Sequence, residues 1–526
     1  MARLPRLVKF DHEARKDVLK GLNLLADAVA TTLGPQGQNV AIGQPHGYPQ
    51  VVHDGVTVAG NIDLFEPFSD IGAQLVKAAA QKTNDVAGDG TTTATILAQA
   101  IVNESMKQIE AGVNPMTLKR QIEEALTYTL KELQKMTVKI ASDEEIEQIA
   151  TIASTDAGIG RLVAEALKKV TIDGSILVEE GKSIETTVDY KQGMEIDRGF
   201  LSPYFVTDNS RVEAVIENPY ILITDKKINY TREIMPFLEM VLKHSKNLVI
   251  FAGEVIEEAL AMLVVNKLKG FIKVVAIQSP AYGDRRLDEL EDIATFTGGI
   301  VIAGESGKEL KDVTIEELGQ AEKVVADRDK ASIVNGSGDR NLVQTRIKEL
   351  KDQLKIANTD YDKVIKEQRL ANLAGKVAII NVGAATEVEV RDKKERIIDA
   401  VNATKAAVSD GIVAGGQITL LSIATMGFWE RLATPGAKIL QEAIKMPFRK
   451  LIENAGLDYA EVWGQLSPVT YPIGIDVFDG KKKDMIKNGI IDPVKVERTA
   501  LQNAVSVATT LITTKVLIVD DPEAKE

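Results

Sequence analysis

The chain has 526 residues, a length that predicts about three or four domains, because single hydrophobic cores stop growing near ~250–300 residues. Its 44% apolar and 26% charged residues are typical of soluble globular proteins. A net charge of −13 argues against a general nucleic-acid binder, and the absence of cysteine excludes disulfides, thiolate metal sites and a cysteine nucleophile.

The N-terminus, Met1 to Phe10, is basic and has no continuous apolar run, and no later segment approaches membrane-spanning length. We therefore expect a cytoplasmic protein without a membrane partner. The four histidines show no metal-ligand spacing, so the sequence does not predict a zinc site.

The first third of the chain predicts long helices. Apolar residues recur every three and four positions over 11–32, and Gly34-Pro35-Gln36-Gly37 ends that helix. Short strands are expected at 39–42 and 51–52. Further helices are expected at 71–82, 91–110, 116–134, 143–153 and 158–169.

Beyond residue 170 the pattern alternates between strands and helices. Strands are expected at 176–179, 184–190, 221–224, 248–252, 274–277 and 299–302, and helices at 233–244, 254–269 and 284–297. This is typical of an α/β domain inserted into a helical one. A charged helical hairpin at 340–373 shows no sign of a site, and long helices return after Thr386.

One short motif, Gly88-Asp89-Gly90-Thr91-Thr92-Thr93-Ala94, suggests a phosphate site. Its glycines would let the backbone approach a phosphate, its threonines stand at a predicted helix start that favours anions, and Asp89 could hold Mg²⁺. An ordinary turn and helix cap would explain the same residues. The chain has neither G-x-x-x-x-G-K-[ST] nor G-x-G-x-x-G after a strand, so any nucleotide site is of another kind.

Other segments could complete such a site. Asp399 lies among apolar residues of a predicted helix, and Gly415-Gly416 permits close backbone approach. His53-Asp54-Gly55 is a further loop with an acid beside a glycine. Taken singly, each segment is explained by a solvated acid, a tight helix contact or a turn, and spacing does not show that they meet.

Two middle helices carry more apolar surface than one buried stripe needs. In 233–244, Met235, Leu238 and Leu242 form a second stripe, and 254–269 adds Leu260, Val264 and Val265. A second stripe indicates either burial all round or an exposed adhesive face.

Over nearly its whole length the chain resembles the bacterial group I chaperonins (GroEL type). The resemblance rests on ordered motifs: Thr32-Leu33-Gly34-Pro35, Gly88 to Thr95, Arg198 to Phe205, Gly283-Asp284-Arg285-Arg286 and Ile490-Ile491-Asp492-Pro493. It implies a multi-domain α and α/β fold. The expected parts are a mainly helical equatorial ATP-binding domain (1–135 and 411–526), a small intermediate hinge domain (136–191 and 376–410) and an α/β apical domain (192–375).

The resemblance also implies a site for ATP and Mg²⁺, with K⁺ as a further candidate ion. Asp89 would hold Mg²⁺, and Asp399, arriving from the intermediate domain, would orient and deprotonate the attacking water with help from Asp54. The nucleotide would be bound by Thr32, Leu33, Gly34, Pro35, His53, Asp89, Gly90, Thr91, Thr92, Thr93, Gly416, Asp476, Ile490 and Asp492.

The implied function is an ATP-driven folding chamber: a homo-oligomer of heptameric rings, in a double ring, that encloses non-native polypeptides under a GroES-type co-chaperonin. The implied surface for these partners comprises Phe200, Tyr204, Phe205, Met235, Leu238, Leu260, Val264 and Val265. No nucleic-acid or membrane partner is implied.

The chain departs from the family pattern at several positions. His53 replaces a usual lysine, Gln36 and Gln38 replace basic residues, Gln417 replaces a third glycine, and Asp476 stands where asparagine is usual. Since Asp54, Asp89 and Asp399 are present, we expect these changes to tune ATP affinity or turnover without abolishing them. The alternative is a holding protein that hydrolyses ATP too slowly to cycle. A small-molecule kinase would need an acceptor pocket with its own base, for which the sequence gives no sign.

Overall fold

The computed structural model describes residues 5–43, 49–140, 142–170, 176–181, 183–208, 211–281, 284–304, 307–355 and 360–521. Gly283 of the motifs above therefore lies outside the described residues. The chain forms two compact units, unit 1 (Met1–Ala164 and Ala385–Glu526) and unit 2 (Glu165–Ala384). Both boundaries fall in segments expected to build the hinge domain, and the division into three domains stays a prediction.

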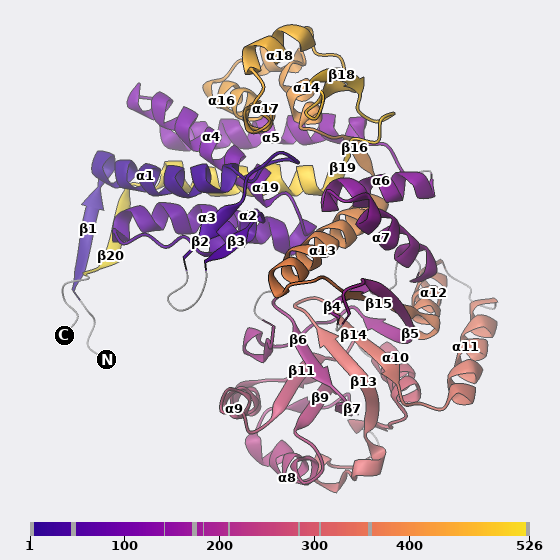
Figure 1. Cartoon of the computed structure of the whole chain (residues 1–526). Coiled ribbons are helices and arrows are strands. Elements are labelled where there is room, and N and C mark those ends of the chain that lie inside the picture. Colours follow the sequence, from indigo (N-terminus) through magenta and orange to yellow (C-terminus); the bar gives the residue numbers. More distant parts are fainter. Residues whose placement is uncertain are drawn as a thin grey trace. The chain divides into compact units, whose positions relative to one another are not determined.

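Unit 1 is mainly helical, and α1, α3, α4, α5 and α19 lie side by side in it (Figure 1). Its helices are α1 (Asp11–Ala30), α2 (Gly55–Gly60), α3 (Pro67–Ala87), α4 (Thr91–Glu110), α5 (Pro115–Met136), α6 (Asp143–Ser154), α13 (Glu387–Asp410), α14 (Ile418–Ala424), α15 (Phe428–Leu432), α16 (Pro435–Ala443), α17 (Met446–Asn454), α18 (Tyr459–Leu466) and α19 (Val494–Thr513). Helix α7 (Ala157–Val170) crosses the boundary between the units.

Two glycines allow α1 and α3 to pack with their backbones in contact. A Cβ on Gly21 would lie 1.8 Å from the carbonyl oxygen of Ser69, and one on Gly72 would lie 2.1 Å from that of Val18. The apolar stripe predicted for α1 is buried against this crossing, with Leu22 and Leu25 fully inaccessible. The predicted helical periodicity is therefore confirmed here.

The strands of unit 1 form two-stranded antiparallel sheets. These are β1 (Arg6–Phe10) with β20 (Val516–Asp520), β2 (Val40–Ile42) with β3 (Gln50–Val52), β16 (Ile412–Ala414) with β19 (Ile491–Pro493), and β17 (Ile473–Asp476) with β18 (Lys481–Asp484). In the β16–β19 pair Val413 lies opposite Asp492, which fixes where the Asp492 side chain stands relative to the Gly415-Gly416 turn.

Unit 2 is an α/β unit built on a ten-stranded mixed sheet. Its main path is β11-β9-β7-β13-β14-β5-β15-β4, with β12 paired to β7 and β6 paired to β13. The strands are β4 (Ile176–Glu180), β5 (Thr187–Ile196), β6 (Ala214–Glu217), β7 (Tyr220–Thr224), β9 (Asn247–Ala252), β11 (Lys273–Gln278), β12 (Val301–Ile302), β13 (Gly319–Ala326), β14 (Ala331–Gly336) and β15 (Lys376–Val382).

The helices of unit 2 include α8 (Thr231–Leu242), α9 (Glu257–Leu268), α10 (Asp284–Thr297), α11 (Arg340–Lys355) and α12 (Asp360–Ala374). One expectation needs correction: the helix predicted at 254–269 begins only at Glu257. Its first residues form strand β10 (Glu254–Val255), because they pair in parallel with β8 (Lys227–Ile228), a contact that helical periodicity cannot reveal.

Candidate functional site

The Gly88–Thr93 loop joins α3 to α4 through two left-handed glycines. Gly88 has φ 69° and Gly90 has φ 85°, a region that other residues enter only at a cost. Gly90 is the N-cap of α4, and within the described chain no side chain caps the first turn of this helix. The threonine hydroxyls instead surround an uncapped helix start, which suits an anion better than the ordinary cap does.

Two more predicted segments lie against this loop. The hydroxyl of Thr32 is 3.2 Å from that of Thr92, and a Cβ on Gly55 would lie 2.3 Å from Thr92 Oγ1. Asp54 is the N-cap of α2, where its carboxylate accepts hydrogen bonds from the backbone of Val56 (3.1 Å) and Thr57 (2.7 Å). The turn after α1 and the His53–Gly55 segment therefore both border the threonine loop.

The turn Leu33-Gly34-Pro35 is held by α17. Asn454 Nδ2 donates to the carbonyl oxygens of Ala30 (2.9 Å) and Leu33 (3.0 Å). Gly34 has φ 83°, and a Cβ there would lie 2.2 Å from Leu451. Leu33 is buried and Pro35 is exposed, so the turn presents its backbone beside Thr32.

Helix α13 carries Asp399 to the same loop. A Cβ on Gly88 would lie 2.4 Å from Asn402 Cβ, one helical turn after Asp399. Burial raises the pKa of Asp399 well above its usual range, and the nearby charges of Asp89, Asp54 and Glu395 raise it further. Burial also raises the pKa of Asp89, with Asp54 adding to the rise and the Gly90 N–H opposing it. The three predicted acids are thus close enough to repel one another.

Asp492 occupies the β16–β19 side of this site. A Cβ on Gly415 would lie 3.0 Å from Asp492 Oδ1, and the Gly415 N–H donates to the carbonyl of Ile490 at 2.9 Å. Burial raises the pKa of Asp492, Asp89 adds to the rise, and a hydrogen bond from the Gly416 N–H opposes it. Gly416 and Ile490 therefore lie together with Asp492, and nucleotide binding by these residues stays a prediction.

Asp476 is engaged elsewhere in its hairpin. Its Oδ2 lies 2.6 Å from Lys483 Nζ, and its Oδ1 accepts from the Phe478 N–H at 2.9 Å. The hairpin does reach the Thr32 side of the site, because Gln36 Nε2 donates to the Val477 carbonyl at 3.0 Å. A nucleotide contact by Asp476 stays a prediction.

His53 faces α13. Burial lowers the pKa of this imidazole, and Arg396 lowers it further, against the opposing charges of Asp392 and Asp54. His53 is therefore neutral at pH 7, and it does not supply the positive charge that a lysine would.

Comparison with known proteins shows which family has this architecture. The family model for the TCP-1/cpn60 chaperonin family matches residues 25–522. This chain is a chaperonin of that family. The predicted family and the predicted multi-domain fold are confirmed.

Among solved structures, the chaperonin is similar to the chaperonin gp146 from the bacteriophage EL 2 (Pseudomonas aeruginosa), crystallised in the presence of ATP-BeFx. The TM-score is 0.70 at 21% identity, over 98% of this chain and 99% of that chain. At this identity the likeness shows the shared fold.

Sequence analysis missed two acids of this chaperonin's site. Burial raises the pKa of Glu395 to about 7, with Asp54 and Asp392 adding to the rise. Glu497 in α19 is 3% exposed, its Oε2 has no hydrogen-bond partner among the described residues, and burial and Asp492 raise its pKa. An acid within the apolar run of α19 was the available signal for Glu497.

Gln417, noted only as a departure, also lies in the site. It takes a left-handed conformation (φ 61°), and its Nε2 donates to Thr93 Oγ1 at 3.3 Å. It therefore steadies one of the threonine hydroxyls at the start of α4.

Some of the predicted partner-binding residues of unit 2 are exposed, and others are buried. Tyr204 (64%), Met235 (37%) and Val265 (45%) are exposed. Phe200, Leu260 and Val264 are partly buried, whereas Phe205 and Leu238 lie in the core. Helices α8 and α9 thus bury one stripe and expose part of a second, and partner binding there stays a prediction.

Proposed function

We propose that this chaperonin binds Mg²⁺·ATP at the start of α4 and hydrolyses it. One observation carries the proposal: Asp54, Asp89 and Asp399 crowd around an uncapped helix start lined with threonine. Repelling carboxylates beside an anion-binding turn are costly by themselves, and a divalent cation with a polyphosphate relieves both costs.

The residues fit Mg²⁺ as a nucleotide-borne ion. Among the described residues no group of three His, Cys, Asp or Glu side chains is placed to hold a metal ion alone. Mg²⁺ needs none, because it takes one or two carboxylates and completes its shell with phosphate oxygens and water. Asp89 would hold it, and the bound ion would neutralise charge on the phosphates during transfer.

The chain's own residues would then perform distinct tasks. The N–H groups and hydroxyls of Thr91, Thr92 and Thr93 bind phosphate oxygens. Asp399 orients the attacking water and accepts its proton, a task that a raised pKa suits. Asp54 assists beside it, and Asp492 with Gly416 holds the ribose and base side of the nucleotide.

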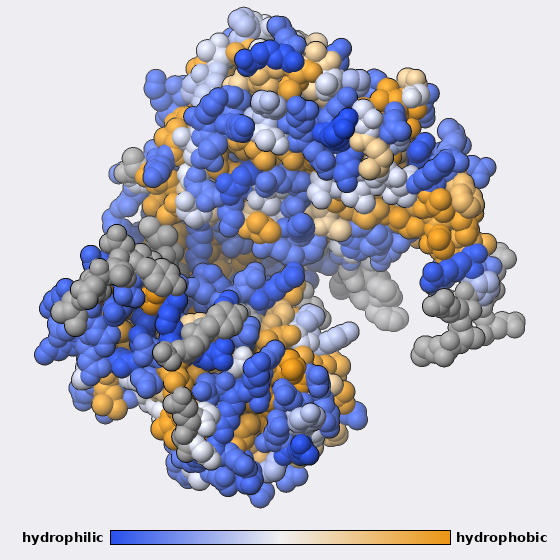
Figure 2. Space-filling view, turned by 180° about the vertical axis from the view of Figure 1, so that it is seen from behind, coloured by the Kyte–Doolittle hydropathy of each residue, from blue (hydrophilic) through white to orange (hydrophobic). Residues whose placement is uncertain are grey.

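Hydrolysis would drive a folding chamber. Non-native polypeptides would bind unit 2 at the exposed part of the α8 and α9 stripe, under a GroES-type co-chaperonin, in heptameric rings in the cytoplasm. An apolar surface on unit 1 supports assembly: Figure 2 shows hydrophobic residues gathered over the β1–β20 end, where Phe10 is 58% and Ile518 is 55% exposed. The described helices include none long and apolar enough to cross a membrane.

The test measures ATP binding and steady-state hydrolysis by the full chain. Asp399→Asn is expected to keep ATP affinity within about threefold and to lose about 10²-fold or more in kcat, the scale of general-base removal. Glu387→Gln, at an exposed position in the first turn of the same helix, is the matched control and should keep wild-type turnover. Wild-type turnover equal to that of Asp399→Asn would overturn the proposal.

A second candidate, a holding protein, is favoured by one observation. His53 is neutral, so it does not bring to the phosphates the positive charge that a lysine at this position would supply. ATP-dependent refolding of a client that requires enclosure, with and without co-chaperonin, separates the two. Client capture without ATP-dependent release would establish the holding protein.

A further inference from the structure

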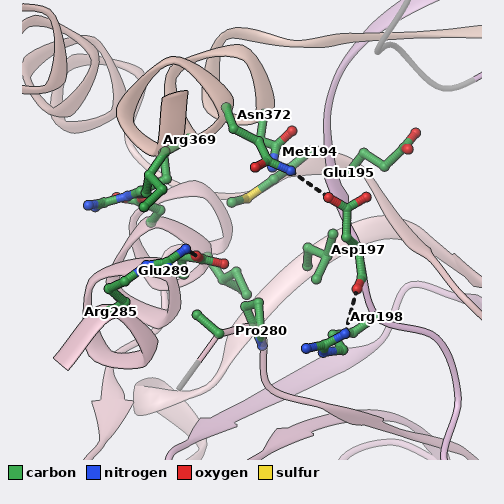
Figure 3. A pocket seen from close by; sticks show the side chains of 15 residues that line it. Met194, Glu195, Asp197, Arg198, Pro280, Arg285, Glu289, Arg369 and Asn372 are labelled. Atoms are coloured by element: carbon green, nitrogen blue, oxygen red, sulfur yellow. Dashed lines mark hydrogen bonds and ion pairs between the residues drawn. The ribbon is translucent and has the colours of Figure 1, made fainter. Parts of the chain in front are cut away.

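Unit 2 contains a cavity of about 310 Å³ away from the exposed stripe of α8 and α9. It lies between the end of β5, the turn after β11, and helices α10 and α12 (Figure 3). This volume is at the lower end for small-molecule sites, which span ~300–1,000 Å³, and it suits a side chain better than a nucleotide.

On one wall of the cavity the charged side chains are fully paired with one another. The buried guanidinium of Arg369 donates to both carboxylate oxygens of Asp292 (2.7 and 3.0 Å) and to Asp288 Oδ2 (2.9 Å). Arg346 adds a further hydrogen bond to Asp292 at 2.7 Å. This network joins α10 to α11 and α12, so Arg369 and Asp292 hold the cavity's shape and are not available to a ligand.

Glu289 is the poorly paired charge in the cavity. Its carboxylate is 23% exposed, and its one ion-pair partner among the described residues, Arg285, lies at 4.0 Å, the outer limit for such a pair. In Figure 3 the side chain points from α10 towards the side where Asp197 and Arg198 lie. Burial raises the pKa of Glu289 the most, the positive charges of Arg285 and Arg369 oppose the rise, and Asp292 and Asp197 add to it. A further cation beside Glu289 would therefore be stabilised.

The remaining lining combines charged side chains of both signs, Glu195, Asp197 and Arg198, with an apolar surface. Asp197 accepts a hydrogen bond from Gln368 Nε2 at 2.6 Å, its Oδ1 lies 3.7 Å from Lys330 Nζ, and its side chain is still 56% exposed. Met194, Ile293 and Ile365 supply apolar wall. A weakly paired acid with an apolar wall beside it matches a cationic group on an aliphatic stem.

We propose that this cavity binds a basic side chain, arginine or lysine, of a polypeptide partner, with its cationic group at Glu289 and Asp197 and its stem along Met194 and Ile365. The inference rests on the proposed function only in taking polypeptides as the partners of unit 2. The cavity would favour partner segments that carry a positive charge, at a place separate from the exposed apolar stripe of α8 and α9.

The test uses the full chain without nucleotide and three labelled, end-blocked pentapeptides of sequence Gly-Gly-X-Gly-Gly. X is arginine, its neutral isostere citrulline, or glutamate, and binding is followed by fluorescence anisotropy. We expect the arginine peptide to bind about five- to tenfold tighter than the citrulline peptide, the scale of a charge-assisted hydrogen bond. Glu289→Gln should remove this preference.

Glu367→Gln is the matched control, because Glu367 lies on α12, is exposed and does not line the cavity. It should keep the preference for arginine. Glu289→Lys should instead favour the glutamate peptide, a reversal that a merely weakened fold would not produce.

Equal binding of the arginine and citrulline peptides by wild type would overturn the proposal, as would an arginine preference that survives in Glu289→Gln. Tighter wild-type binding of the glutamate peptide would assign the cavity to anions instead. ATP hydrolysis and client refolding, measured on the same preparations, report on the proposed function separately. If the chain fails those assays and still prefers the arginine peptide, the basic side-chain site is supported and the proposed function is contradicted.

Discussion

At the scale of single residues, His53 sets the charge beside the threonine loop. It is neutral near pH 7 because burial and Arg396 lower its pKa. His53→Lys would place a permanent positive charge there, so we expect ATP to bind about three- to tenfold tighter, on the order of 1 kcal/mol. Titration with a fluorescent ATP analogue measures this. His12→Lys, on an exposed part of α1, is the control and should leave affinity unchanged. Unaltered affinity in His53→Lys would contradict the assigned role.

The raised pKa of Glu395 leads to a separate prediction, about how stability depends on pH. Its pKa rises from 4.5 in the unfolded chain to about 7 in the folded one, so the folded state binds more protons between these values. Stability contributed by this group is therefore lost as pH rises from about 4.5 to about 7. Glu395→Gln removes that loss, and we expect it to unfold at a higher temperature than wild type at pH 8. At pH 4 the two should unfold together. A variant that is less stable at pH 8 would refute this assignment.

At the scale of elements, the approach of α13 to the α3–α4 loop depends on Gly88. A side chain there would be strained at φ 69° and would collide with Asn402 at 2.4 Å. We expect Gly88→Val to displace α13, and with it Asp399, lowering kcat at least tenfold with a smaller change in ATP affinity. Gly112→Val is matched, because Gly112 also has a left-handed φ of 94° but nothing within 4 Å of its Cβ position. Hydrolysis and ATP-binding assays on both variants separate the effect of backbone strain, which both share, from the displacement of α13, which only Gly88→Val should cause. Equal losses in the two would show that α13 does not depend on this contact.

At the scale of the whole molecule, the β1–β20 sheet gathers several exposed apolar side chains on one element, as interaction surfaces do. Phe10→Asp with Ile518→Asp places charges on two exposed positions of this sheet, so we expect a smaller particle than wild type. Light scattering after size-exclusion chromatography measures the mass. Leu342→Asp, at a 62% exposed position of α11, is the control and should keep the wild-type mass. An unchanged mass in the double variant would exclude this sheet from the assembly contact.

Long, strongly periodic segments could be predicted from sequence alone. Helices α4 and α10 begin and end at the predicted residues, because Gly90 and the 3.6-residue apolar repeat mark them locally. Strands β13, β14 and β15 were not predicted. Their formation depends on partners far along the chain, such as Lys376 opposite Gln192, and no local pattern specifies that pairing.

For the proposed site, the sequence by itself determined the residue types: glycines, threonines and three acids that could hold phosphates and Mg²⁺, and that turns, a helix cap and solvated acids would also explain. The family motifs joined those segments into one expected site. Only the tertiary structure decided which groups perturb one another. Burial and mutual repulsion raise the pKa values of Asp89 and Asp399, and burial raises those of Glu395 and Glu497 beside them. Burial and the charge of Arg396 lower the pKa of His53. The reason is physical: residue types are written locally, but desolvation and charge proximity arise only when distant segments pack together.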